Sequence, residues 1–252
     1  PLLAGAISSV TGIPQSTGLT LVILVIVCAI YTFSVYFGMK GVQLSAATCT
    51  WLFFGLLAYV FFFGGQTRFI IEEGITALGN LTQNFIGLAT WTDSLRTSSF
   101  PQTWTIFYWA YWMVWCVAVP FFIGSISKGR TLRQVILGGY VFGLSGTFTS
   151  FIIMGNYGLG LQMHGKLDVL STYTADGNLY HAILDILGQL PLSKAVLVLL
   201  VLCMITFYST SFDSITMVAS TYTYKELKSD EEPHRNVKLF WAIFLILLPL
   251  AL

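Results

Sequence analysis

The sequence contains very little charge: of its 252 residues, only 9 % are Asp, Glu, Lys or Arg. A soluble domain carries roughly 25 % charged residues, so this composition excludes an ordinary soluble protein. The net charge of +1 leaves no basic surface for nucleic acid. The hydrophobic content of 56 % also excludes a disordered chain. The sequence therefore predicts an all-α, polytopic protein of the cell membrane.

Cysteine and catalytic motifs are scarce as well. The four cysteines have no CxxC spacing and no neighbouring histidine: Cys28, Cys49, Cys116 and Cys203. Such residues are typical of small buried apolar side chains, and they predict neither a disulfide nor a transition-metal site. The sequence contains no GxSxG or HExxH motif. We therefore expect no enzyme, no catalytic residue and no organic cofactor.

The few charged residues separate long apolar runs. No charged residue precedes Lys40, and similar gaps follow it along the chain. Each gap can hold a helix of about 20 residues, the length that crosses about 30 Å of hydrocarbon. We predict five complete spans and one cut span at 19–37, 45–63, 104–126, 134–155, 195–221 and 239–252.

The segment 66–103 is too long for a turn between two spans. Its apolar residues recur at roughly helical spacing between Glu, Asn, Thr and Gln: Phe69, Ile70, Ile75, Leu78, Leu81 and Phe85. This pattern predicts an amphipathic helix on the outer face of the membrane.

Basic residues are divided unequally between the two sets of loops. Four lie in one set of loops, and eight lie in the opposite set, which the positive-inside rule predicts to be cytoplasmic. The eight are Lys40, Lys128, Arg130, Arg133, Lys225, Lys228, Arg235 and Lys238.

The third predicted span is unusually rich in aromatic residues. Trp104, Tyr108, Tyr111 and Trp115 share one helical face, and Trp112 lies beside them. An aromatic belt at the interface explains the first two, whereas Trp112 and Trp115 lie near mid-span and favour a pocket or tight packing. Ring faces attract quaternary ammonium groups, and this span has no acidic residue.

Two further features concern helix shape. Pro120 removes a backbone donor and predicts a kink at the lower end of the aromatic segment. Gly139 and Gly143 form a GxxxG spacing in the fourth span, which predicts close packing against another helix.

The fifth span combines hydroxyl groups with a charge near its centre. Single Ser or Thr residues in such helices usually bond back to the preceding turn. A group of them beside a carboxylate is less usual, and sodium binds oxygen ligands: Ser209, Thr210, Ser211, Asp213 and Ser214. An aspartate at the centre of a span costs about 2.5–3.5 kcal/mol, so we expect Asp213 to be functional or paired and not to face lipid.

These segments resemble a known family. The run FYWAYWMVW (107–115), followed by IGSISKGRTLR (123–133), resembles the signature of the betaine/choline/carnitine transporters. STSFDS (209–214) resembles a motif of the family's sodium-coupled members. The resemblance covers nearly the whole chain, with several motifs in the same order and at matching distances.

The resemblance implies a twelve-helix fold with two inverted five-helix repeats, similar to the sodium-coupled amino-acid transporters, and a homotrimer. This chain would run from the end of the fifth helix into the eleventh. The implied substrate-binding residues are Tyr108, Tyr111, Trp112 and Trp115, although the family usually has Trp where this chain has Tyr111. The implied sodium ligands are the hydroxyls of Thr210 and Ser211 and the carbonyl of Phe207.

The resemblance also favours sodium coupling over exchange. The sodium-independent carnitine exchangers look apolar at the positions of Thr210 and Ser211, and they tend to have Met where this chain has Val119. We therefore expect a secondary transporter of glycine betaine, choline or carnitine that uses sodium and alternating access, with Asp213 and Val119 in supporting roles. The alternatives are a sodium-independent exchanger and, more remotely, a membrane sensor or enzyme.

Overall fold

The computed structural model describes residues 2–116, 119–176, 178–227 and 231–251. The described part is helical and contains no strand, which confirms the predicted all-α class. In chain order the elements are α1 (Leu2–Thr11), α2 (Thr17–Tyr36), α3 (Met39–Phe63), α4 (Thr67–Gln83), α5 (Phe85–Thr90), the π-helix η1 (Pro101–Ile106), α6 (Phe107–Trp115), α7 (Val119–Ile126), α8 (Leu132–Ser150), the π-helix η2 (Phe151–Gly155), α9 (Asn156–Met163), α10 (Val169–Asp176), α11 (Leu179–Gly188), α12 (Ser193–Tyr222) and α13 (Arg235–Ala251).

Four helical segments of the described chain are long and apolar enough to cross a membrane. They are Thr17–Tyr36, Lys40–Phe63, Leu132–Met163 and Ser193–Tyr222. The predicted spans 19–37, 45–63, 134–155 and 195–221 fall almost entirely within these segments. Hydrophobic run length agrees with these segments because a spanning helix needs about 20 mostly apolar residues.

The predicted single span at 104–126 is wrong in its continuity. The predicted span begins within η1, and it covers α6, which ends at Trp115, and α7, which begins at Val119. Residues 117 and 118, between α6 and α7, lie outside the described residues. The end of α6 agrees with the predicted effect of Pro120, whose ring clashes with the carbonyl four residues earlier and which offers no N–H.

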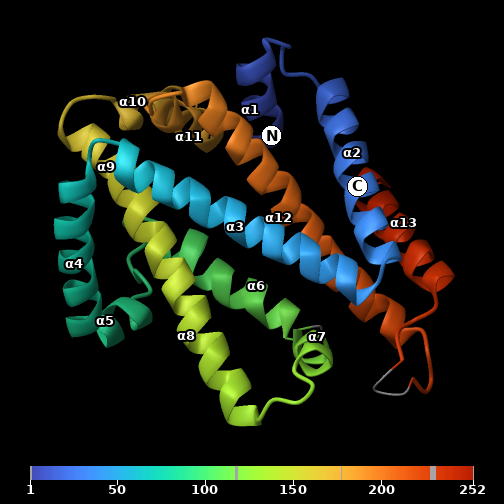
Figure 1. Cartoon of the computed structure of the whole chain (residues 1–252). Coiled ribbons are helices and arrows are strands. Elements are labelled where there is room, and N and C mark those ends of the chain that lie inside the picture. Colours follow the sequence, from blue (N-terminus) through green and yellow to red (C-terminus); the bar gives the residue numbers. More distant parts are fainter. Residues whose placement is uncertain (1, 117–118, 177, 228–230, 252) are drawn as a thin grey trace.

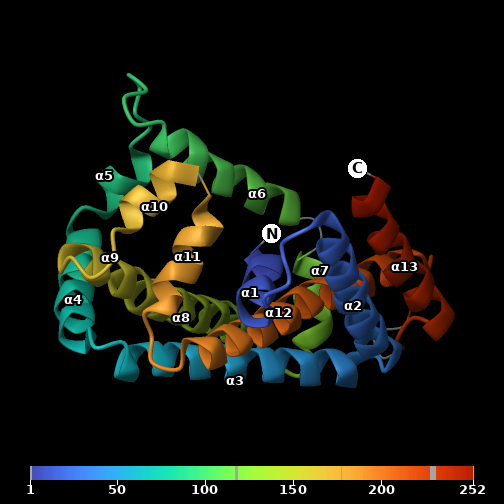
Figure 2. The same ribbon diagram turned by 90° about the horizontal axis from the view of Figure 1, so that it is seen from above.

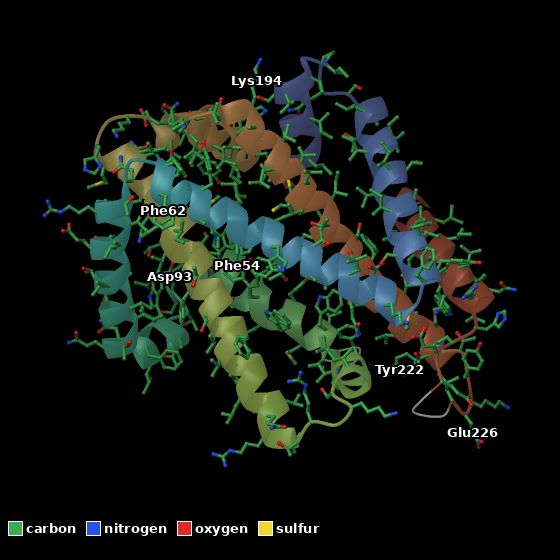
Figure 3. The ribbon with its side chains drawn as sticks, in the orientation of Figure 1. Phe54, Phe62, Asp93, Lys194, Tyr222 and Glu226 are labelled. Carbon is green, nitrogen blue, oxygen red and sulfur yellow. The ribbon has the colours of Figure 1, made fainter. Side chains whose placement is uncertain are left out.

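The longest helix, α12, lies at the centre of the packing. It contacts α3 along one side and α1, α2 and α13 along the others (Figure 1). Lys194 and Tyr222 mark its two ends in Figure 3. The main buried cluster joins α12 to α3, α9 and α11 through apolar side chains that include Val60, Tyr157, Leu187 and Leu197.

The turn between α2 and α3 is short. The predicted spans 19–37 and 45–63 leave residues 38–44 between them, but α3 already begins at Met39. Gly38 makes this tight turn possible because its φ of 71° lies in the left-handed region. The two helices diverge from the turn and do not pack along their whole length (Figures 1 and 2).

The predicted amphipathic helix within 66–103 is two helices, α4 and α5, followed by a loop. On α4 the structure buries Ile70 and Gly74 against η2 and α9, whereas Ile75 and Leu78 remain exposed. In the loop, Asp93, which is labelled in Figure 3, accepts hydrogen bonds from the backbone N–H and hydroxyl of Ser98 and from the hydroxyl of Thr97. These donors, the Ser98 N–H above all, lower the pKa of Asp93 to about 2.

Two glycines of α4 should respond oppositely to alanine. A Cβ at Gly74 would lie 2.6 Å from Cγ2 of Ile152, whereas a Cβ at Gly79 meets no atom within 4 Å. Gly79→Ala should stabilise the protein by about 0.5–1 kcal/mol through helix propensity. Gly74→Ala should destabilise it by about 1–3 kcal/mol, because β-branched Ile152 has little freedom to move. Thermal unfolding in detergent measures both, and equal shifts of the same sign would contradict the tight α4–η2 contact.

The GxxxG prediction for α8 is not borne out within the described chain. A Cβ added at Gly139 or Gly143 would meet no atom within 4 Å. α8 has no buried residue, because among the described elements its close neighbour is its own continuation, η2. GxxxG spacing makes close approach possible, but it does not supply the second helix.

Candidate functional site

The aromatic segment forms α6, a helix with no buried residue. Its rings contact one another along a single face. Tyr111 lies 5.9 Å from Trp112 and 6.0 Å from Trp115, measured between ring centroids. Tyr108 stacks on Trp104 one turn earlier. The side chain of Trp112 is 62 % exposed, so the aromatic face is open among the described residues.

The hydroxyl-rich part of α12 faces α3 across a cavity of about 320 Å³. Phe207, Thr210, Ser211 and Ser214 line it from α12, and Ala46, Cys49 and Thr50 line it from α3. Across the gap, the hydroxyls of Ser45 and Thr210 lie 3.4 Å apart. We call this space the α3–α12 cavity.

Each hydroxyl on the α12 wall donates to a carbonyl of the preceding turn. Thr210 donates to Thr206, Ser211 to Phe207 and Ser214 to Thr210. This back-bonding uses the hydroxyl protons and leaves oxygen lone pairs free. The cavity wall therefore offers uncharged oxygen atoms whose lone pairs can coordinate a cation. Such ligands suit a hard monovalent cation.

Asp213 lies on a different face of α12. At 100° per residue it points about 160° away from Ser211 around the helix axis. It is fully buried, and its Oδ2 accepts a hydrogen bond of 2.8 Å from the hydroxyl of Ser34 on α2. Its Oδ1 has no hydrogen-bond partner among the described residues. The carboxylate therefore joins α12 to α2 and does not line the α3–α12 cavity.

The structure brings the predicted sodium ligands together but keeps the predicted aromatic residues apart from them. Phe207, Thr210 and Ser211 share one cavity. None of the described residues that line it comes from α6, which lies away from α3 in Figure 2. Val119 is half-buried at the start of α7, and α7 does contact α12.

Sequence reasoning missed the α3 side of this cavity. Ser45 and Cys49 are four residues apart on one helical face, and Thr50 follows directly. This spacing could have indicated a polar face on α3. The surrounding residues are apolar, however, and the segment was interpreted only as a membrane span. Only contact with α12 distinguishes them from ordinary small residues of a membrane helix.

The fold and the site define a polytopic helical membrane protein with a polar cavity and a buried carboxylate between its helices, features that occur in membrane transporters. Comparison with known proteins identifies the family. The betaine/carnitine/choline family of transporters matches residues 1–252, and the chain belongs to it.

Individual relatives agree with this assignment. The chain is 30 % identical to a carnitine transporter of Acinetobacter baumannii, over 98 % of the chain and 44 % of the relative. It is 28 % identical to a probable glycine betaine transporter of Desulfitobacterium hafniense, over 96 % of the chain and 47 % of the relative. The chain spans about half the length of the curated relatives it matches.

Proposed function

We propose that the protein is a secondary active transporter that moves a quaternary-ammonium compound into the cell together with sodium. Glycine betaine, choline and carnitine are the candidate substrates. Family membership and relatives named for carnitine and glycine betaine support the substrate class. Transport would follow alternating access around a site near the middle of the membrane. The homotrimer remains a prediction from the family resemblance.

One observation carries the sodium proposal. The carbonyl-bearing residue Phe207 and the hydroxyls of Thr210 and Ser211 line the same cavity from one helix. Sodium bound at these oxygens would favour the loaded, outward-facing state. Asp213 would act as a positioning residue, because its hydrogen bond to Ser34 fixes the rotation of α12 relative to α2.

For the substrate, we propose that Tyr111, Trp112 and Trp115 hold the trimethylammonium group by cation–π contacts, with Tyr108 one turn away. Their rings already lie against one another on α6. A permanently charged ammonium donates no strong hydrogen bond, so ring faces can hold it without a carboxylate partner.

Uptake into proteoliposomes tests the proposal. The purified protein should accumulate radiolabelled glycine betaine, carnitine or choline several-fold faster with an inward sodium gradient than with potassium on both sides. A sodium ionophore should abolish the difference. Equal rates in sodium and potassium, together with stimulation by substrate inside the vesicles, would establish the sodium-independent exchanger instead. Absence of both uptake and counterflow for all three compounds would favour a sensor or enzyme.

A further inference from the structure

A largely apolar groove lies between α2 and α13, and it shares no lining residue with the α3–α12 cavity. Its volume is about 590 Å³, within the range of about 300–1,000 Å³ typical of small-molecule sites. Its lining is mostly apolar and includes Val25, Ala29 and Phe33 from α2, Phe37 directly after α2, and Leu239 and Ile246 from α13, with Thr32 as a polar member.

The walls of this groove are fixed by specific contacts. The hydroxyl of Tyr31 donates to the carbonyl of Ala242 and so holds α13 against α2. Tyr31 also stacks on Phe212 of α12, with ring centroids 5.3 Å apart. On the groove side, Phe33 and Phe37 meet edge to face at 4.8 Å. The groove is therefore a built feature of the helix packing.

The length of the groove matches one leaflet of the bilayer. On α2 it extends from Val25 to Tyr36, which at 1.5 Å per residue is about 16 Å. Half of a hydrocarbon core of about 30 Å is about 15 Å. Tyr36 ends the spanning helix, so the groove runs from near the middle of the membrane to its surface.

A cation lies at the surface end of the groove. Arg235 is the first residue of α13, and its guanidinium carbon lies 5.2 Å from the centroid of the Tyr36 ring. The cation–π contact with Tyr36 does not use up the five N–H donors of a guanidinium, which can bind an anion such as phosphate. Lys40 is exposed at the start of α3, directly after the turn at Gly38. Both basic residues belong to the side predicted to be cytoplasmic, where anionic lipids are enriched.

We propose that the α2–α13 groove binds one acyl chain of an anionic phospholipid, with Arg235 on the lipid phosphate. The apolar lining of the groove accepts the acyl chain, and the length of the groove matches a single leaflet. Arg235 selects an anionic head group. This binding is independent of the transported substrate and of sodium, so it stands or falls separately from the proposed function.

Lipid retention by the purified protein tests the head-group contact. The protein is reconstituted into vesicles of equal parts phosphatidylglycerol and phosphatidylethanolamine, re-purified and analysed by native mass spectrometry. The wild type should retain one phosphatidylglycerol per chain. Arg235→Gln should lower the preference for phosphatidylglycerol about fivefold, the factor that corresponds to about 1 kcal/mol per basic residue. The control Arg130→Gln, a basic residue of the α7–α8 turn, should leave the preference unchanged.

Filling the groove tests the acyl-chain contact. Ala29→Phe should remove the retained lipid whatever its head group, whereas Val22→Phe, at an exposed position of α2 outside the groove, should not. Circular dichroism and size-exclusion chromatography show whether each variant is folded. Unchanged retention in Ala29→Phe would overturn the proposal and would indicate that another protein segment covers the groove. Unchanged head-group preference in Arg235→Gln would overturn it as well.

Discussion

The double variant Thr210→Val with Ser211→Ala should raise the sodium concentration for half-maximal uptake at least tenfold. Both substitutions remove an oxygen that lines the α3–α12 cavity and leave the helix backbone intact. A polar contact to a charged group contributes about 1.5–3 kcal/mol, so the loss of even one such contact exceeds a factor of ten. Folding should be little affected, because the hydroxyl of Ser211 bonds within its own helix and Thr210 loses, besides its bond to Thr206, only one long contact of 3.4 Å to the hydroxyl of Ser45.

A matched control lies one turn earlier on the same helix. Thr206 also bonds back to carbonyls of the preceding turn but does not line the cavity. Thr206→Ala should therefore leave sodium dependence unchanged. An equal effect of Thr206→Ala and the double variant would assign the loss to helix structure and would contradict the sodium site.

Cys49 provides a readout of sodium binding that does not depend on transport. It lines the cavity, whereas Cys28 and Cys203 are buried and Cys116 is exposed elsewhere. In a Cys116→Ser background, sodium should slow the reaction of Cys49 with a maleimide, and the double variant should lose this protection. Protection that persists in the double variant would place the sodium ion at other ligands.

Trp112→Ala should weaken substrate affinity about tenfold. A cation–π contact contributes about 0.5–2 kcal/mol, and the upper part of that range applies when the site is shielded from water. The double variant Trp112→Ala with Trp115→Ala should lose more than either single change, because both rings touch Tyr111. Binding of radiolabelled glycine betaine to the purified protein measures the change without the transport cycle.

Trp109 is the control for this prediction. It is an exposed tryptophan of α6 that lies about 60° around the helix axis from Trp112 and outside the face shared by Tyr108, Tyr111 and Trp115. Trp109→Ala should leave affinity unchanged. Normal affinity in Trp112→Ala would exclude this ring from the substrate site, and equal losses in both variants would show a general need for aromatic bulk.

The sequence predicted most spanning helices because a single property locates them. Residues 195–221 contain an apolar run long enough to cross the membrane, and α12 extends it by only a few residues. Local chemistry also located Asp213 as a residue that lipid would not accept. Both predictions depend on the residues themselves and not on which helices surround them.

Predictions that needed a partner were less successful. The GxxxG spacing of Gly139 and Gly143 places both glycines on one face of α8 and makes close helix packing possible. Among the described residues, however, no atom lies within 4 Å of a Cβ added at either position. The single span at 104–126 failed for a related reason. Hydrophobicity measures whether a segment tolerates lipid, whereas the end of α6 at Trp115 depends on backbone sterics near Pro120.

The sequence by itself determined the membrane class, the positions of most spans and the motifs that carry the family resemblance. These follow from composition and local order, because the bilayer imposes the same requirement on every spanning residue. Only the tertiary structure decided how the two faces of α12 are used. Ser211 faces a cavity shared with α3, while Asp213 is buried against Ser34 of α2. Helical periodicity fixes the angle between these two side chains. The positions of α3 and α2 determine that Ser211 faces a cavity and that Asp213 meets a hydrogen-bond donor.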